Sequence, residues 1–281
     1  AWWAGFNDPV LDALVEAALD GNIDIAAAGE RLLAAEALAG AARSDFIPTL
    51  DGGLSGRADT SGNDNSAASL DMTFVPDVNG ATRRSVERAR ARLAARGYAI
   101  EDLRRLTAAS VAQRYVELRR TRARLALLDT SLDLQARTLN IVERRREAGL
   151  AADLDVQRAT ADLARTRAQR GLLALSETRA LNALSILLGR PPEGELAAFG
   201  LTEAGRDADA DLMLQYEGAP AAGLPADLLR SRPDLRAAEA ELVAATAAIG
   251  IATADLYPGL RLPGSISADL DGSAADDVVA S

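Results

Sequence analysis

Carboxylates and arginines are the only charged side chains in this 281-residue chain, which contains no His, Cys or Lys. Their absence excludes disulfides, thiol nucleophiles, imidazole bases and metal sites built from His or Cys. Enzymatic chemistry would therefore need facing carboxylates, and the best candidates are Asp153 and Asp155. Side chains two residues apart do not face one another on a helix, and acids at a helix start are favoured by its dipole. We therefore expect no enzyme, no cofactor and no metal.

Arginine supplies all 31 basic residues, and the charge is unevenly distributed along the chain. Residues 1–82 carry a net charge of −10, residues 83–179 carry +10, and residues 180–281 carry −10. A basic segment of this kind raises the question of nucleic-acid binding. Acids interrupt the arginines at helical spacing, however, and Tyr98 and Tyr115 do not form a stacking platform for bases. The pattern favours solvated helix faces, and we expect no nucleic-acid partner.

A second group of candidate recognition residues surrounds Gly149. Glycine has the backbone freedom to end a helix, and Asp153 and Asp155 lie where the next helix would begin. Leu150 and Leu154 are apolar side chains in a turn that would otherwise be polar. Two interpretations stay open, because the leucines either hold the turn together or contact a partner.

Two long helices must position this turn. Residues 83–147 contain no Pro and a single Gly, and at ~1.5 Å per residue such a helix spans about 97 Å. A second helical pattern covers residues 153–188, so the short break predicts an antiparallel helical hairpin. Apolar residues recur every seven positions along the first helix, which predicts a coiled-coil seam. These residues are Val111, Leu118, Leu125, Leu132 and Leu139.

The N-terminal part predicts helices followed by a β-hairpin. Asp8 and Pro9 open a first helix, and a second, alanine-rich helix covers about residues 24–45 and ends before Pro48. From residue 50 the apolar period changes to two, on both sides of a turn-rich segment at residues 60–65. One face of this hairpin then carries Leu50, Leu54, Leu70, Met72 and Phe74. The strands have the length of membrane-crossing strands, but a soluble hairpin packed on the helices would alternate in the same way.

An internal repeat relates the two ends of the chain. Residues 24–50 align without a gap on residues 234–260, with 12 of 27 positions identical. Gly40, Asp45 and Pro48 match Gly250, Asp255 and Pro258, and these matches are harder to obtain by chance than alanines. The chain therefore holds one unit of helix, β-hairpin, helical hairpin and connector, and then the opening of a second unit.

The order of these elements resembles the outer-membrane efflux channel family (TolC-like), in particular its NodT-type lipoprotein branch. The resemblance covers nearly the whole chain and rests on short motifs in order. These are Trp2-Trp3, Asp8-Pro9, Asn22, Asp77 to Gly80, Tyr115, Gly149 with Leu154 to Val156, Leu187 to Gly189 with Pro191-Pro192, Leu224-Pro225, Arg232 to Asp234, Gly250 and Pro258.

The resemblance implies a mainly α fold in which a homotrimer forms an α-barrel in the periplasm and a β-barrel in the outer membrane of a Gram-negative bacterium. It implies a passive exit duct that works with a periplasmic adaptor (membrane fusion) protein and an inner-membrane transporter. The implied segments are N-terminal helices (1–48), lipid-facing barrel strands (49–78), a periplasmic helical hairpin with its tip near 148–155 (79–189), an equatorial connector (190–231) and the start of a second repeat (232–281). The tip residues Gly149, Leu150, Leu154, Asp155 and Val156 match the adaptor contact, and Asp155 also matches a residue that helps to close the channel entrance.

The chain departs from that family in several respects. It begins without a signal peptide or a lipid-carrying Cys, and we expect sequence beyond both of its ends. No aromatic girdle is evident around the strands, Asn79 stands where an aromatic is expected, and the second β-hairpin and second helical hairpin are expected to be missing. The competing interpretation is a periplasmic coiled-coil scaffold or adaptor-like protein without a pore. No stretch of 18 apolar residues occurs, so no transmembrane helix is expected.

Overall fold

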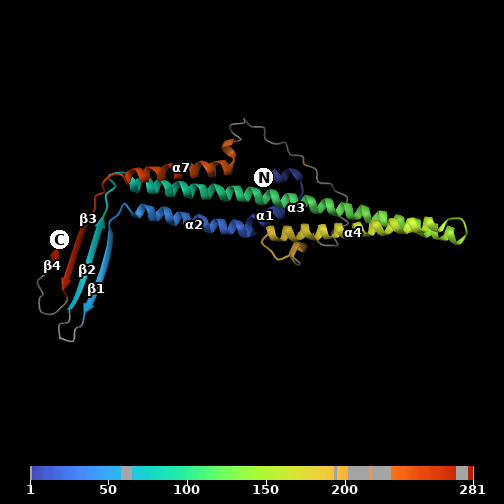
Figure 1. Cartoon of the computed structure of the whole chain (residues 1–281), viewed down its shortest axis with the longest axis horizontal. Coiled ribbons are helices and arrows are strands. Elements are labelled where there is room, and N and C mark those ends of the chain that lie inside the picture. Colours follow the sequence, from blue (N-terminus) through green and yellow to red (C-terminus); the bar gives the residue numbers. More distant parts are fainter. Residues whose placement is uncertain are drawn as a thin grey trace. The chain divides into compact units, whose positions relative to one another are not determined.

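The computed structural model of the chain describes residues 2–57, 65–192, 195–201, 216, 229–269 and 278–280. In chain order its elements are η1 (Trp2–Phe6), α1 (Pro9–Gly21), α2 (Ile23–Ser44), β1 (Thr49–Arg57), β2 (Asn65–Phe74), α3 (Ala81–Glu147), α4 (Asp153–Leu187), η2 (Glu195–Phe199), α7 (Pro233–Ala254), β3 (Leu262–Asp269) and β4 (Val278–Ala280) (Figure 1). Contacts divide the chain into two compact units. The first comprises Ala1–Ala27 and Glu101–Leu224, and the second comprises Ala28–Ile100 and Pro225–Ser281.

The core of the first unit lies where α1 packs against α3 and α4. As the sequence predicts, Asp8 caps α1, and its Oδ1 accepts hydrogen bonds from the backbone N–H groups of Val10 (2.8 Å) and Leu11 (3.1 Å), while Pro9 occupies the first turn. The apolar face of α1 is then fully buried. The buried residues of this core include Leu11, Leu14, Val15, Ala18, Val111, Tyr115, Leu118, Leu184 and Leu188.

The predicted seven-residue seam of α3 is buried only along part of its length. Val111, Leu118 and Leu125 are buried, whereas Leu132 and Leu139, nearer the turn, are half-buried. Three helices meet around the first group, but only α3 and α4 remain beyond it. A pair of helices covers each seam residue from one side, which leaves the opposite side open to solvent or to another chain.

A close backbone contact joins the α1–α2 turn to the end of α4. Asn22 is buried, its Nδ2 donates to the carbonyl of Leu187 (2.9 Å), and its Oδ1 accepts from the backbone N–H groups at the start of α2. A Cβ on Gly21 would lie 2.6 Å from the carbonyl oxygen of Leu188, and a Cβ on Gly189 would overlap the carbonyl oxygen of Gly21. Gly189 also has a φ of +69°, which favours glycine. Two glycines are therefore needed for this crossing.

The second unit holds a four-stranded antiparallel sheet in the order β1-β2-β3-β4. The register pairs Leu50 of β1 with Met72 of β2, and it pairs Leu70 of β2 with Gly52 of β1 and Ile266 of β3. The apolar positions of the three strands therefore share one face. This corrects the expectation that the second β-hairpin is missing, because Leu262–Asp269 pairs with β2 and Val278–Ala280 pairs with β3. The strand was missed because its short alternation contains Pro263 and Gly264, which weaken a strand pattern.

The structure reproduces the internal repeat as two helices of equal length. α2 (Ile23–Ser44) and α7 (Pro233–Ala254) are both 22 residues long, and their ends are 210 residues apart, which is the offset of the repeat. Both helices run beside α3 (Figure 1). Among the described helices, α7 is long and apolar enough by composition to cross a membrane, although no run of 18 apolar residues occurs. Its buried residues are all alanines, which indicates close helix packing as the source of this apolar composition.

Hydrogen bonds of Asp77 and Asn79 hold the connection between β2 and α3 in place. The Asp77 carboxylate accepts hydrogen bonds from the backbone N–H groups of Thr82 (2.9 Å) and Arg83 (3.0 Å) in the first turn of α3. The Asn79 Nδ2 donates to the carbonyl of Pro258 at 3.1 Å. Asn79, which replaces the expected aromatic, therefore ties the start of α3 to the second repeat.

Candidate functional site: an exposed apolar turn and an uncovered sheet face

The turn between α3 and α4 is built by a glycine, as predicted. Gly149 has a φ of +71°, its N–H donates to the carbonyl of Arg146 (2.9 Å), and the N–H of Leu150 donates to the carbonyl of Arg145 (2.7 Å). These two bonds define a Schellman helix end, which needs a left-handed residue at the position of Gly149. The turn is therefore fixed by its backbone and leaves its side chains free for other contacts.

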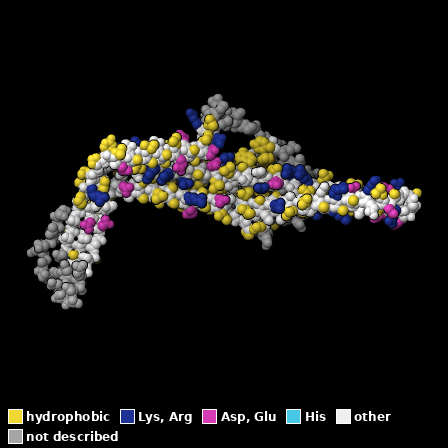
Figure 2. Space-filling model, in the orientation of Figure 1, with side chains coloured by type: hydrophobic (Ala, Val, Ile, Leu, Met, Phe, Trp, Pro, Cys, Tyr) yellow, Lys and Arg dark blue, Asp and Glu magenta, His cyan; other side chains and the backbone are white. Residues whose placement is uncertain are grey.

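The leucines of this turn do not hold it together. Leu150 is 77% exposed and Leu154 is 57% exposed, whereas Val156 is half-buried. This exposure argues against the interpretation in which the leucines staple the turn. Figure 2 shows hydrophobic side chains exposed at many positions on the helices, including this end of the hairpin. An exposed pair of large apolar side chains at the end of a hairpin is the kind of surface that another protein covers.

The acids of the turn lie at the start of α4 and face solvent. Asp153 and Asp155 occupy the first turn of α4, whose N-cap residue Ala152 makes no side-chain capping bond. Asp153 lies 3.7 Å from Arg146 across the turn, and both side chains are largely exposed. An exposed pair of this kind contributes little stability. Both acids therefore remain accessible beside the leucines, and the structure does not bring them together as a catalytic pair.

The apolar face of the sheet is uncovered. Leu54 is 85% exposed and Leu50 is 65% exposed, Leu70 and Met72 are also exposed, and Phe74 is half-buried. None of the strand residues whose burial the structure describes is buried. The alternative in which the hairpin packs on the helices is therefore not what the structure shows. The opposite face is polar and carries Thr49, Asp51, Ser55, Ser69, Asp71, Thr73, Ser265 and Ser267.

Three aromatic residues flank the strands at one end of the sheet. Phe46 precedes β1, Phe74 ends β2, and Tyr257 precedes β3. Because neighbouring strands are antiparallel, these positions all lie at the end of the sheet that adjoins the helices. Phe46 and Tyr257 are exposed. These three aromatics are up to 211 positions apart in the sequence, so only the strand pairing brings their positions to the same end of the sheet.

Two polar clusters inside the first unit were missed from the sequence. Arg122 of α3 and Glu177 of α4 form a buried ion pair, with Nε and Oε1 3.0 Å apart and side chains 1% and 4% exposed. The Tyr115 hydroxyl donates to Asp8 Oδ2 (2.9 Å), and Arg119 Nη1 lies 3.1 Å from that hydroxyl. Burial raises the pKa of the Tyr115 phenol well above its usual value of about 10, and Asp8 adds to this increase. Both clusters join elements far apart in the sequence.

Comparisons with known proteins agree with this architecture. Residues 14–190 match the family model described as outer membrane efflux protein. The chain is 33% identical over 281 residues to nodulation protein T of Rhizobium leguminosarum bv. trifolii, covering 95% of this chain and 57% of that protein. It is 32% identical over 282 residues to the pyoverdine export outer membrane protein OpmQ of Pseudomonas aeruginosa, again covering 95% and 57%. The chain therefore spans little more than half the length of these relatives.

Solved structures show the same fold. The outer-membrane channel OprN matches with a TM-score of 0.84 and 31% identity, covering 100% of this chain and 64% of that one. The outer membrane protein VceC of Vibrio cholerae matches with a TM-score of 0.78 and 25% identity, covering 100% and 69%. The helical hairpin with its glycine turn, the sheet with its apolar face and the alignment over residues 14–190 lead to one assignment: the chain belongs to the outer membrane efflux protein family.

Proposed function

We propose that this chain is part of an outer-membrane channel protomer of a tripartite efflux pump, which acts as a passive exit duct for small molecules. The observation that carries the proposal is the uncovered apolar sheet face, in a chain whose family relatives export solvents and pyoverdine. A large apolar surface that no element covers is unfavourable in water and favourable against lipid. β1 and β2 are 9 and 10 residues long, which suits a strand that crosses the outer membrane.

The sheet and the helices point to assembly with further copies of the chain. An open sheet exposes unpaired N–H and C=O groups at its edges, and these groups are satisfied in a membrane only when the sheet closes into a barrel. The half-buried seam of α3 and α4 likewise leaves apolar surface that a neighbouring protomer would cover. A homotrimer, as in the resembling family, supplies both kinds of contact, with the helices in the periplasm.

The α3–α4 turn is proposed as the contact for a periplasmic adaptor protein, which links the duct to an inner-membrane transporter. Leu150 and Leu154 supply exposed apolar contact, and Gly149 and Val156 shape the turn around them. Asp155 is proposed to act differently, as one half of an interaction that helps to close the channel entrance. Its partner would belong to the second helical hairpin of the complete protein.

The experiment is Leu150→Asp in the complete protein, expressed in cells that depend on the pump. We expect loss of drug resistance and of adaptor crosslinking while trimers still form, because the change removes an apolar contact without touching the seam. Gln157→Asp is the matched control, since it adds the same charge at an exposed position of α4 and should leave export unchanged. Asp155→Ala should keep the crosslink and admit a large antibiotic.

Two outcomes would overturn this proposal. Normal export and normal crosslinking by Leu150→Asp cells would show that the turn only joins two helices. Recovery of the complete protein in the soluble periplasmic fraction, without membrane trimers, would instead favour the coiled-coil scaffold.

A further inference from the structure

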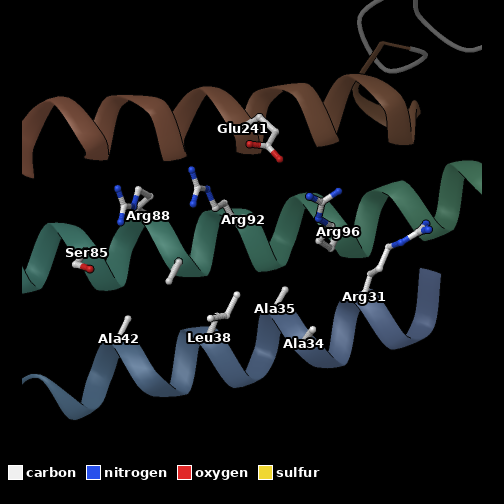
Figure 3. A pocket seen from close by; sticks show the side chains of 11 residues that line it. Arg31, Ala34, Ala35, Leu38, Ala42, Ser85, Arg88, Arg92, Arg96 and Glu241 are labelled. Carbon is white, nitrogen blue, oxygen red and sulfur yellow. The ribbon is translucent and has the colours of Figure 1, made fainter. Parts of the chain in front are cut away.

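A basic groove runs along α3 in the second unit, and none of its lining residues belongs to the turn or to the sheet face described above. Its volume is about 780 Å³, which lies within the range of ~300–1,000 Å³ typical of small-molecule sites. Figure 3 shows Arg88, Arg92 and Arg96 on the side of α3 that faces α7, and Arg31 on α2. One acid, Glu241 of α7, also lines the groove. Four cations and one anion give the groove a local charge of +3.

The arginines form a regular column. Positions 88, 92 and 96 are four residues apart, so their side chains follow one face of α3 at intervals of about 6 Å along the axis. Like charges at this spacing repel one another and destabilise a helix by a few tenths of a kcal/mol per pair. An anionic group beside the column would relieve this repulsion and would be attracted by more than one arginine.

No such anion is supplied by the described part of the chain. Within the described residues, none of the four arginine side chains has an ion pair or a hydrogen bond, and Glu241 lies beyond ion-pair distance from them. Elsewhere on the long helices some arginines have acidic partners close by, such as Arg105 with Asp102, whereas others, such as Arg90 and Arg120, have none among the described residues. The groove differs from a helix face of alternating charge in another respect, because three arginines follow one another along it and one acid, Glu241, is in its lining.

Apart from Ser85, the rest of the groove is apolar. Ala34, Ala35, Leu38 and Ala42 of α2 point toward α3 (Figure 3), and Leu38 is 68% exposed. Guanidinium groups bind carboxylate, sulfonate and phosphate groups with two parallel hydrogen bonds. A ligand that satisfies both parts of the groove has two or three anionic groups about 6–12 Å apart on an apolar body.

We propose that this groove is a binding site for a soluble organic polyanion of that kind. The arginines of α3 hold its charged groups, and the α2 side chains contact its apolar body. This inference goes beyond the proposed function, because it concerns a ligand held by residues of α2, α3 and α7 and not the passage of molecules through a channel. It also gives three of the arginines of α3 a specific role.

The test measures binding of pyrenetrisulfonate, a flat fluorescent trianion, to the full chain in non-ionic detergent by fluorescence anisotropy. We expect saturable binding that weakens as salt is added, because exposed charges are screened. Changing Arg88, Arg92 and Arg96 to Gln should weaken binding by about tenfold per arginine, or about 1.4 kcal/mol each. The matched control changes Arg83, Arg90 and Arg104 of the same helix to Gln, which alters the net charge equally.

The two triple variants decide the outcome. Binding that survives in the control and is lost in the groove variant supports the site. Equal loss in both variants would show attraction to net charge alone, and unchanged binding in the groove variant would place the ligand elsewhere; either result overturns the proposal. Far-UV circular dichroism of each variant checks that the helices are retained. Leu38→Ala provides a second test because it removes apolar contact from α2 without changing the charge; weaker binding supports the site, and unchanged binding overturns the apolar contact.

Discussion

Replacing Gly189 by alanine tests the backbone crossing that joins α1, α2 and α4. The new Cβ would overlap the carbonyl oxygen of Gly21 and lie 3.0 Å from its carbonyl carbon, at a φ of +69°. A left-handed conformation costs a residue with a Cβ roughly 1–2 kcal/mol, and overpacking costs about 1–3 kcal/mol more. The expected loss in the free energy of unfolding is therefore about 2–5 kcal/mol.

Two other glycines separate these contributions. Gly149 has nearly the same φ of +71°, but a Cβ there meets no atom within 4 Å, so Gly149→Ala should cost only the conformational ~1–2 kcal/mol. Gly171 lies inside α4 in open space, and Gly171→Ala should stabilise the helix by about 0.5–1 kcal/mol. The three variants thus form a graded series in which each step has one physical cause.

The assay is urea unfolding of the chain in non-ionic detergent, followed by far-UV circular dichroism. With an m-value of about 2 kcal/mol/M, Gly189→Ala lowers the midpoint by about 1–2.5 M, Gly149→Ala lowers it by about 0.5–1 M, and Gly171→Ala raises it slightly. Equal shifts for Gly189→Ala and Gly149→Ala would refute the close contact with Gly21. A loss of stability in Gly171→Ala would refute the graded series as a whole.

Further expectations follow from the buried and exposed clusters. Glu177→Leu leaves Arg122 buried without its ion-pair carboxylate and should lower the free energy of unfolding in urea by about 3–5 kcal/mol. Adding Arg122→Met should recover most of this loss, and a double variant no more stable than Glu177→Leu alone would contradict the expectation. In the complete protein, Leu54→Arg should cost ~2–4 kcal/mol near the membrane centre and reduce trimer yield, while Ser55→Arg on the polar face should cost little; equal effects would disprove the lipid-facing assignment. The folded state keeps the Tyr115 proton to higher pH than the unfolded state does, so stability should fall as pH rises above about 10. Tyr115→Phe should reduce this pH dependence when unfolding midpoints are measured at about pH 8 and about pH 11. An equal pH dependence in the variant would refute the role of Tyr115.

Local patterns in the sequence determined most of the element boundaries. The absence of Pro across residues 83–147 and the heptad of apolar residues predicted α3, which begins only two residues earlier than expected. Gly149 was predicted to end that helix and does so in a left-handed conformation. The alternation around Leu50 and Leu70 predicted two strands and the side chains that share a face. Such features depend on backbone preferences and periodicity over a few residues, which a sequence displays directly.

The repeat could also be recognised in the sequence, but the strand that follows its second helix could not. An offset of 210 residues predicted a second helix like α2, and α7 has the matching boundaries. The strand that follows α7 escaped notice because Pro263 and Gly264 interrupt its pattern. Pairing with β2 decides its place in the sheet, and no local signal in residues 262–269 encodes that partner.

Contacts between remote residues were decided by the tertiary structure alone. Whether Arg122 and Glu177 meet depends on how α3 and α4 rotate about their axes, and many arginines and acids in those helices have the same local pattern. The crossing at Gly189 and the arginine groove in α3 depend in the same way on which helices lie alongside one another. Periodicity specifies which face of a helix is apolar, but the partner of a buried or unpaired charge is chosen by packing, because electrostatic and steric contacts act through space and not along the chain.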